Sequence, residues 1–428
     1  MCSLKTNRYF IERHAGGERL LLVHVDFHSH PNHSLAEFQE LVRSAGGIVC
    51  ELITGKRHSP QAKYFIGTGK AEEVRVAVQA MSVDVVLFNH TLTPAQERNL
   101  EKLFQCRVLD RTGLILDIFA TRARTFEGQL QVELAQLQHL STRLVRGWSH
   151  LERQRGGIGL RGPGETQLEC DRRSLGLRLQ AIRHQLTAVR RQRTQGRRAR
   201  RRAAIPTVAL VGYTNAGKST LFNHLTESHV YTADKLFATL DPTLRRLFLP
   251  PLGSIIVADT VGFLHDLPHE LIAAFRATLE EVCLANLLLH VIDSQAPSAH
   301  DIVASVNQVL MAIGAADIPQ LQIYNKIDLR DNIAPRMERE EGGKPQAIWV
   351  SALTGAGIDL LRQAMTELLA DALLECEITL TPQEASLRAQ LYALGAVVSE
   401  KVDESGSYSL KLTIQKKDYQ QLLGKRQG

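Results

Sequence analysis

One stretch near the middle of the chain restricts its fold more than any other. The apolar run 207–211 is followed by a glycine-containing turn and then by a helix-forming segment that begins near Thr220. The turn has the spacing G-x-x-x-x-G-K-S and consists of Gly212, Tyr213, Thr214, Asn215, Ala216, Gly217, Lys218 and Ser219. In a strand–turn–helix unit of this kind, backbone N–H groups surround phosphate oxygens and the helix N-terminus adds positive potential. The sequence therefore predicts a phosphate-binding loop on an α/β sheet.

The last two residues of this loop have predicted chemical roles. Lys218 can extend its ammonium group to the β and γ phosphates of a nucleotide, and the Ser219 hydroxyl can ligate Mg²⁺. The alternative is a tight turn that carries lysine and serine without binding phosphate. Three further stretches favour the nucleotide site, and two of them directly follow an apolar strand.

The first stretch follows the strand 254–258 and consists of Asp259, Thr260, Val261 and Gly262. A carboxylate at that strand end can hold the Mg²⁺ shell, and the Gly262 N–H can contact the γ-phosphate. A segment before this strand is expected to respond to the γ-phosphate, namely Phe237, Ala238, Thr239, Leu240 and Asp241. One threonine there should complete the Mg²⁺ shell when the γ-phosphate is present, and we choose Thr239 over Thr243.

The second stretch follows the strand 321–324 and consists of Asn325, Lys326, Ile327 and Asp328. A carboxylate accepts hydrogen bonds from both N1–H and the 2-amino group of guanine, and adenine offers neither donor there. Asp328 therefore predicts selection of GTP over ATP, with Asn325 and the Lys326 stem supporting the loop and the base. After the strand 347–350, one backbone N–H can reach the guanine oxygen from Ser351, Ala352 or Leu353.

The predicted catalytic residues are Lys218, Thr239 and Gly262, and the predicted metal ligands are Ser219 and Thr239. Many small GTPases carry a glutamine where this chain has Phe263. A phenyl ring cannot orient the attacking water, so we expect slow intrinsic hydrolysis unless a partner, an ion or another residue assists. Asn215 occupies a position where several potassium-activated GTPases carry asparagine, which makes bound K⁺ one hypothesis and a hydrogen bond within the loop the other.

The chain of 428 residues is long enough for several domains, and its hydrophobic periodicity divides it into four. Residues 1–124 alternate strands and helices, which predicts a small parallel sheet covered on both faces. Residues 125–202 are predicted to form an antiparallel helical hairpin, residues 203–372 a Ras-like P-loop GTPase domain, and residues 373–428 a small α+β domain.

Three short signals locate helix starts in the first domain. Ser34 is a predicted N-cap with Glu37 as its capping-box partner, and Thr93 is a predicted N-cap followed by proline. The turn Gly67-Thr68-Gly69-Lys70 lacks the spacing of a phosphate loop, so the turn entering a helix is favoured over nucleotide binding there.

The predicted hairpin combines apolar seams with a strong local charge. One seam consists of Leu130, Leu134, Leu137 and Leu144, and the other consists of Leu168, Leu175, Leu179, Ile182, Leu186 and Val189. The glycine-rich loop 156–164 is expected to form the tip, together with the flanking residues Arg143, Arg146, Trp148, His150, Arg153, Arg155 and Arg161.

The second helix carries a run of arginines without an intervening acid. They are Arg172, Arg173, Arg178, Arg183, Arg190, Arg191, Arg193, Arg197, Arg198, Arg200, Arg201 and Arg202. Because the whole chain has a net charge of only +6, this concentration indicates a localised polyanion-binding element. A solvated helix face is the alternative, although like charges without a nearby polyanion repel one another.

Composition restricts the compartment. The six cysteines contain no C-x-x-C pair, so the sequence indicates neither a zinc site nor a disulfide framework. The first residues lack the apolar region of a signal peptide, and the most apolar run, 284–292, is too short for a membrane span. We expect a cytoplasmic monomer without stable membrane insertion, and peripheral association with a membrane is left open.

Taken together, the motifs resemble those of the HflX family of ribosome-associated GTPases. Many GTPases share the phosphate loop and the segments 237–241 and 259–263, whereas the hairpin motif 157–169 is the part that points to this family. The resemblance covers nearly the whole chain. The resemblance implies Mg²⁺-dependent hydrolysis of GTP to GDP, stimulated by the large ribosomal subunit. It also implies contact with rRNA and dissociation of stalled or stress-inactivated ribosomes.

Two other functions remain open at this point. A GTPase that acts on free RNA or in ribosome assembly would share the basic charge, but it would bind naked RNA at physiological salt. A non-catalytic GTP sensor, with arginines that contact acidic protein or membrane, would not be stimulated by ribosomes.

Overall fold

The computed structural model describes most of the chain in separate segments. These are residues 17–27, 34–144, 163–202, 205–227, 236–237, 242–250, 252–264, 279, 281–296, 299–330, 333–394, 396–403, 407–415 and 419. The chain forms two compact units, Met1–Thr121 with Ala135–Arg178, and Arg122–Leu134 with Leu179–Gly428. The division into four domains stays a prediction.

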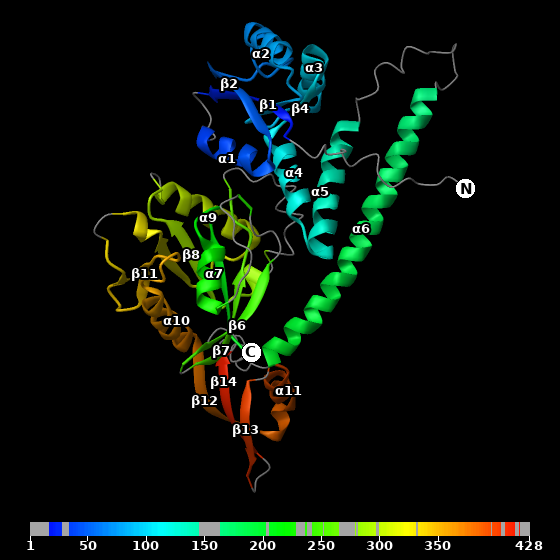
Figure 1. The fold of residues 1–428 in the computed structure, drawn as a ribbon. Coiled ribbons are helices and arrows are strands. Elements are labelled where there is room, and N and C mark those ends of the chain that lie inside the picture. The colour runs from blue at the N-terminus through cyan, green and yellow to red at the C-terminus, as the bar shows by residue number, and fades with distance from the viewer. Residues whose placement is uncertain are drawn as a thin grey trace. The chain divides into compact units, whose positions relative to one another are not determined.

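The N-terminal sheet has four parallel strands in the order β2-β1-β3-β4. Figure 1 labels β1, β2 and β4 of this sheet. The strands are β1 (Arg19–Phe27), β2 (Ile48–Arg57), β3 (Val85–Phe88) and β4 (Arg107–Leu109). The helices are α1 (Leu35–Ala45), α2 (Thr68–Met81), α3 (Pro94–Phe104) and α4 (Arg111–Arg122). Leu21 and Val23 belong to a core with residues of α2 and α3, and the alternating Leu20 and Leu22 are also buried. Both faces of β1 are therefore covered, as the sequence predicts.

Local hydrogen bonds explain where these helices begin. Ser34 accepts a hydrogen bond from the Glu37 N–H, while the Glu37 carboxylate forms a buried ion pair with Arg111. Thr93 and Gln96 form a complete capping box, with proline in the first turn. The segment 67–70 is the entry to α2, which begins at Thr68 after Gly67.

Two long helices follow, α5 (Phe126–Leu144) and α6 (Pro163–Arg202). Ile182 and Leu186 are buried, Leu175 and Leu179 are half-buried, and the intervening Leu177 is 62% exposed. This alternation confirms the predicted apolar seam of the second helix from Leu175 to Leu186, while the Leu168 side chain lies outside the described residues. The segment 145–162, which includes most of the predicted tip loop 156–164, lies outside the described residues, and so do the side chains of 163–168, 190 and 193–202. Residues 163 and 164 were predicted to belong to the loop, but they form the first turn of α6.

One residue assigned to the tip belongs elsewhere. The Arg143 guanidinium is 17% exposed and bonds Glu97 Oε2 at 2.6 Å and Asp110 Oδ2 at 2.9 Å. Asp110 also accepts the Gly113 N–H at 2.7 Å near the start of α4. Arg143 therefore secures the end of α5 to α3 and α4, and its assignment to a free basic tip is wrong.

The largest sheet has seven strands in the order β10-β11-β9-β8-β5-β7-β6. They are β5 (Thr207–Gly212), β6 (Thr243–Leu249), β7 (Gly253–Asp259), β8 (Leu287–Asp293), β9 (Gln320–Asn325), β10 (Arg336–Arg339) and β11 (Pro345–Trp349). The edge strands β6 and β10 are antiparallel to their neighbours, and the strands between them are parallel. This is the predicted P-loop GTPase architecture.

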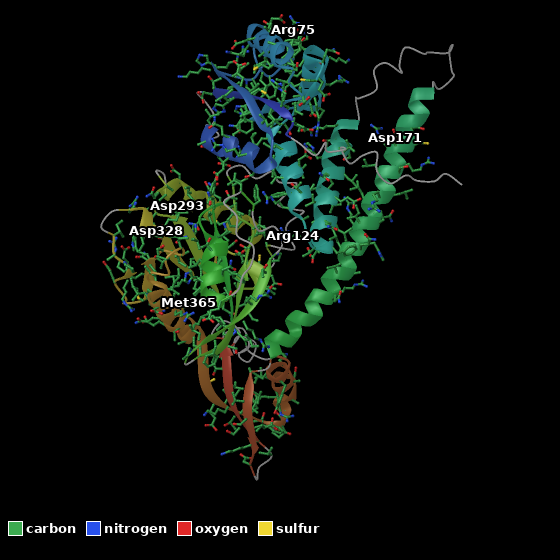
Figure 2. The ribbon with its side chains drawn as sticks, viewed as in Figure 1. Arg75, Arg124, Asp171, Asp293, Asp328 and Met365 are labelled. Atoms are coloured by element: carbon green, nitrogen blue, oxygen red, sulfur yellow. The ribbon has the colours of Figure 1, made fainter. Side chains whose placement is uncertain are left out.

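Helices cover both faces of this sheet. Residues of α7 (Lys218–Thr226) and α10 (Ile358–Ala372), including Met365 labelled in Figure 2, form one core with Val208, Leu210 and Leu289. Residues of α9 (Ala299–Ile313) form the other core with Val211 and Leu288. Alternate residues of β5 and β8 thus point to opposite faces, which accounts for their almost uninterrupted apolar sequences.

The C-terminal part consists of a small antiparallel sheet and a helix that lies between its first two strands in the sequence. Its strands are β12 (Leu373–Leu380), β13 (Val397–Val402) and β14 (Tyr408–Gln415), in the order β12-β14-β13, and α11 is Ala385–Leu394. Leu380, Leu391 and Leu410 are buried in its core. Across the parts of the chain that the structure describes, no helix is both long and apolar enough to cross a membrane.

Candidate nucleotide site

The predicted site residues meet at the carboxyl ends of the parallel strands. β5 ends at Gly212, β7 at Asp259, β8 at Asp293 and β9 at Asn325. Figure 2 labels Asp293 and Asp328 in this part of the domain. In open α/β sheets this edge is where ligands bind, because the loops that leave the strands converge there.

Two glycines of the phosphate loop allow close approach of neighbouring atoms. Gly212 has φ +141°, and a Cβ there would lie 2.2 Å from the carbonyl oxygen of Val291. Gly217 has φ +90°, and a Cβ there would lie 2.2 Å from Asn325 Nδ2. Gly217 precedes α7 and provides no side-chain cap, so no capping side chain occupies this helix N-terminus, whose positive potential favours an anion.

Lys218 lies inside the loop rather than in solvent. Its side-chain ammonium donates to the Tyr213 carbonyl oxygen at 2.6 Å, and the residue is 6% exposed. Burial lowers the pKa of Lys218 to about 8, and the nearby Asp259 carboxylate opposes this shift. A bound phosphate would oppose it further, since a second anion favours the charged ammonium.

Ser219 and Asp259 provide the oxygen atoms that a magnesium site requires. The Ser219 hydroxyl donates to Asp259 Oδ2 at 2.7 Å, and Asp259 is fully buried at the end of β7. Thr260 donates to the carbonyl oxygen of Leu210 at 2.5 Å, which ties this stretch to β5. A hydroxyl and a carboxylate are hard oxygen ligands of the kind that Mg²⁺ prefers, so the residues present fit the ion.

Phe263 has a structural role that the sequence did not reveal. Its N–H donates to the Gly212 carbonyl at 3.1 Å, and its carbonyl accepts the Thr214 N–H at 2.9 Å. The residue is 3% exposed and belongs to the core with Val211 and Ala258. The ring therefore packs in the protein interior, in agreement with the expectation that this residue does not orient water.

Asn325 joins three segments of the site. Its Nδ2 donates to the carbonyl oxygen of Ala216 at 2.9 Å, and its Oδ1 accepts the Ala352 N–H at 2.8 Å. Asn325 is 1% exposed, so both bonds are protected from water. A single side chain thus connects the phosphate loop to the two loops that were predicted to hold guanine.

The predicted base-binding residues have defined partners as well. The Ser351 hydroxyl donates to Asp328 Oδ1 at 2.5 Å, which orients that carboxylate. Lys326 has φ +64°, and its ammonium pairs with Asp293 Oδ2 at 2.8 Å. Asp293 is absent from the sequence prediction, and its position at the end of a buried strand was the available signal.

The remaining predicted residues are only partly placed. Ile327 is 4% exposed and Leu353 is 74% exposed, while Phe237 is buried with φ +56°. Thr243, the alternative to Thr239, is the first residue of β6 and pairs with Asp259 in the sheet. The other members of that segment lie outside the described residues, namely Ala238, Thr239, Leu240 and Asp241.

Four family models match successive parts of the chain. They are described as GTP-binding GTPase N-terminal (residues 32–120), GTP-binding GTPase Middle Region (122–200), 50S ribosome-binding GTPase (207–326) and HflX C-terminal domain (336–428). A solved GTP-binding protein from the archaeon Sulfolobus solfataricus, in complex with GDP, is 23% identical with a TM-score of 0.44, and the match covers 83% of this chain and 99% of that one.

Curated relatives match along most or nearly all of the chain. GTPase HflX of Escherichia coli (strain K12) is 55% identical over 412 residues, which cover 96% of this chain and 97% of that protein. GTPase HflX of Magnetococcus marinus is 49% identical over 344 residues, which cover 80% of this chain and 79% of that protein. With the P-loop fold and these similarities in hand, the chain belongs to the HflX family of GTPases and hydrolyses GTP.

Proposed function

We propose that this GTPase binds the large ribosomal subunit and its rRNA, is stimulated by that subunit, and dissociates stalled or stress-inactivated ribosomes. It would act in the cytoplasm as a monomer. The observation that carries the ribosome assignment is the basic surface of α6, a helix of 40 residues. The family model that matches the adjacent residues 207–326 is described as 50S ribosome-binding GTPase, which supports an RNA-binding role for the α6 surface.

The nucleotide is held by the residues that meet at the strand ends. Phosphates bind at the turn 212–219 and the N-terminus of α7, where Lys218 contacts them, and the Asp328 carboxylate accepts the guanine N–H groups. Ser351 supports this assignment because its hydroxyl holds Asp328 Oδ1 at 2.5 Å. In Asp328→Asn, an amide N–H would face guanine donors, so GTP affinity should fall by about 2 kcal/mol or more. Equal affinity of the unmodified protein for ATP and GTP would contradict the assignment.

Magnesium is assigned to Ser219 directly and to Asp259 through the ion's water shell. When bound, Mg²⁺ supplies positive charge to the β and γ phosphates. Thr239 is the proposed second threonine ligand, used when the γ-phosphate is present. Ser219→Ala should weaken Mg²⁺-dependent binding of GTP and GDP alike, whereas Thr239→Ala should affect GTP more. Equal losses for both nucleotides in Thr239→Ala would leave Thr243 or no threonine as the switch ligand.

The proposal includes a potassium ion at the phosphate loop, and Asn215 is the residue assigned to it. Its side-chain oxygen would help to hold K⁺ against the phosphates, where added positive charge stabilises the transition state. Turnover is compared in potassium and sodium at equal ionic strength, and identical rates remove this assignment.

The arginines of α6 are suited to contact rRNA phosphates. Among the described side chains, Arg172, Arg173, Arg183 and Arg191 are exposed. Each arginine that neutralises a phosphate displaces counterions, so affinity for RNA falls steeply as salt rises. The α6 surface would therefore supply charge-dependent affinity, and the glycine-rich loop 156–164 would fit the irregular rRNA surface.

The decisive experiment is co-sedimentation with large ribosomal subunits in GTP, GDP and a non-hydrolysable GTP analogue. Binding should be strongest with the analogue, and turnover should rise when subunits are added. A variant in which Arg172, Arg173, Arg183 and Arg191 are all changed to glutamine should bind more weakly. Its plot of log affinity against log salt should be less steep by about one unit for each lost phosphate contact.

Two ion-paired arginines outside α6, the half-buried Arg75 and the exposed Arg339, provide a control. Arg75 pairs with Glu72, and Arg339 pairs with Glu367, so neither carries an uncompensated charge. Arg75→Gln with Arg339→Gln should leave the salt dependence unchanged. If the control and the α6 variant lose the same affinity, or if naked RNA binds as tightly as ribosomal subunits at physiological salt, the ribosome assignment is wrong.

A further inference from the structure

Thr214 differs from its neighbours in the phosphate loop because its buried hydroxyl has no hydrogen-bond partner among the described residues. The residue is 6% exposed. Its backbone N–H, by contrast, is used by the Phe263 carbonyl at 2.9 Å. Most buried hydroxyls in folded proteins have a partner, and one that lacks it in a ligand-binding loop calls for an explanation.

The Thr214 side chain lies beside Gly262 and Lys218. A Cβ built on Gly262 would meet Thr214 Cα and Cγ2 at 2.8 Å and the Lys218 ammonium nitrogen at 3.0 Å. Gly262 is therefore enclosed by the threonine side chain and the lysine ammonium. In the proposed nucleotide site, Lys218 and the Gly262 N–H both contact the γ-phosphate. The Thr214 side chain consequently lies at the γ-phosphate end of the loop.

No side chain from position 263 competes for this place. The Phe263 ring is buried with Val211 and Ala258, and its backbone is fixed by bonds to Gly212 and Thr214. Position 263, where many small GTPases carry a glutamine that orients water, therefore has no amide here, and its side chain points into the core. The Thr214 hydroxyl is attached to the same Cβ as the methyl group that meets Gly262, so the phosphate loop itself supplies a polar group in this region.

We propose that the Thr214 hydroxyl contacts the γ-phosphate of bound GTP and orients the attacking water. This role rests on the proposed nucleotide site. The hydroxyl donates its hydrogen to a γ-phosphate oxygen and accepts one from the water. The water oxygen then forms a bond to the γ-phosphorus while the bond to the β–γ bridging oxygen breaks. Its electron pair stays on GDP, and the proton of the water leaves with inorganic phosphate.

Two substitutions separate the hydroxyl from the shape of the side chain. Thr214→Val keeps the shape and removes the hydroxyl, whereas Thr214→Ser keeps the hydroxyl. We expect valine to slow single-turnover GTP hydrolysis about tenfold or more, and serine to stay within a few-fold of the unmodified enzyme. Affinity for a fluorescent GDP analogue should change little in both, because GDP has no γ-phosphate.

The matched control is Thr366→Val on α10. The Thr366 hydroxyl bonds the Arg362 carbonyl within its own helix at 2.9 Å, away from the strand ends that form the site. This variant should hydrolyse GTP at the unmodified rate. Hydrolysis by Thr214→Val at the control rate would overturn the proposal, and so would a loss of GDP affinity that accounts for the whole effect. Failure of the unmodified protein to bind GDP would instead refute the nucleotide site itself.

Discussion

Removal of the Asn325 side chain should disconnect the phosphate loop from the base-binding loops of the nucleotide site. Asn325→Ala deletes the bonds to the Ala216 carbonyl and the Ala352 N–H, which are 2.9 and 2.8 Å long. Ala216 and Ala352 are 1% and 2% exposed, so water has little access to the two groups left behind. An unsatisfied buried polar group costs about 1–3 kcal/mol.

Two such groups imply a loss of about 3 kcal/mol in the free energy of unfolding, or roughly 100-fold in the folded-to-unfolded ratio. The loss falls in the lower half of the range because loops at a strand edge can relax towards water. Asn325→Asp should cost at least as much, since a carboxylate oxygen would then face the Ala216 carbonyl oxygen. Affinity for GDP should fall in both variants because the phosphate loop loses its connection to the base-binding loops.

Urea unfolding of the nucleotide-free protein measures this loss. Trp349 is a suitable reporter because it stacks on Tyr324 with 4.5 Å between ring centroids at the end of β11. Trp148→Phe removes the other tryptophan signal. Asn307→Ala on α9 is the matched control, since its side-chain oxygen has no hydrogen-bond partner in the described part of the chain. If Asn325→Ala unfolds at the same urea concentration as the control and binds GDP normally, the two hydrogen bonds do not support the site.

Three other substitutions test the site and its interior. Gly212→Ala would place a Cβ 2.2 Å from the Val291 carbonyl oxygen at φ +141°, so GDP binding should be lost in titrations even if the protein still folds. Phe263→Gln should lower thermal stability by burying an amide and should not raise the intrinsic GTPase rate, because position 263 faces the core. Burial lowers the pKa of His290 to about 4, and the charge of Lys218 contributes to the same shift. Because His290 of the unfolded chain takes up a proton at a higher pH than the folded one, the free energy of unfolding falls as pH drops from about 6.5 towards 4. His290→Leu should flatten that decline when urea unfolding is compared at pH 7 and pH 5.

Much of the fold is predictable because its signals are local. The strand before Gly212, the capping box at Thr93 and the apolar seam through Ile182 each depend on residues close in sequence, and the structure contains all three. The spacing of Lys218 from Gly212 likewise follows from the geometry of one turn. For this reason the P-loop domain could be recognised before its tertiary structure was known.

The connections within the site could not be predicted in the same way. Asn325 bonds a residue 109 positions earlier and another 27 positions later, and no local pattern specifies those pairs. The burial of Phe263 is a similar case. Chemistry alone shows that phenylalanine cannot position water, but only the tertiary structure shows that its ring fills the core and that its backbone extends the phosphate-loop strand.

Arg143 shows how a charge changes meaning with its partners. Along the chain it is one of several arginines next to a glycine-rich tip, and charge counting assigns it to RNA. In the folded protein its partners are Glu97, 46 positions earlier, and Asp110, 33 positions earlier. Two carboxylates around one partly buried guanidinium leave no positive charge for a phosphate, and bringing RNA to it would break these bonds. Arg143 is therefore removed from the proposed RNA contact surface, and the exposed arginines of α6 remain the residues proposed for it.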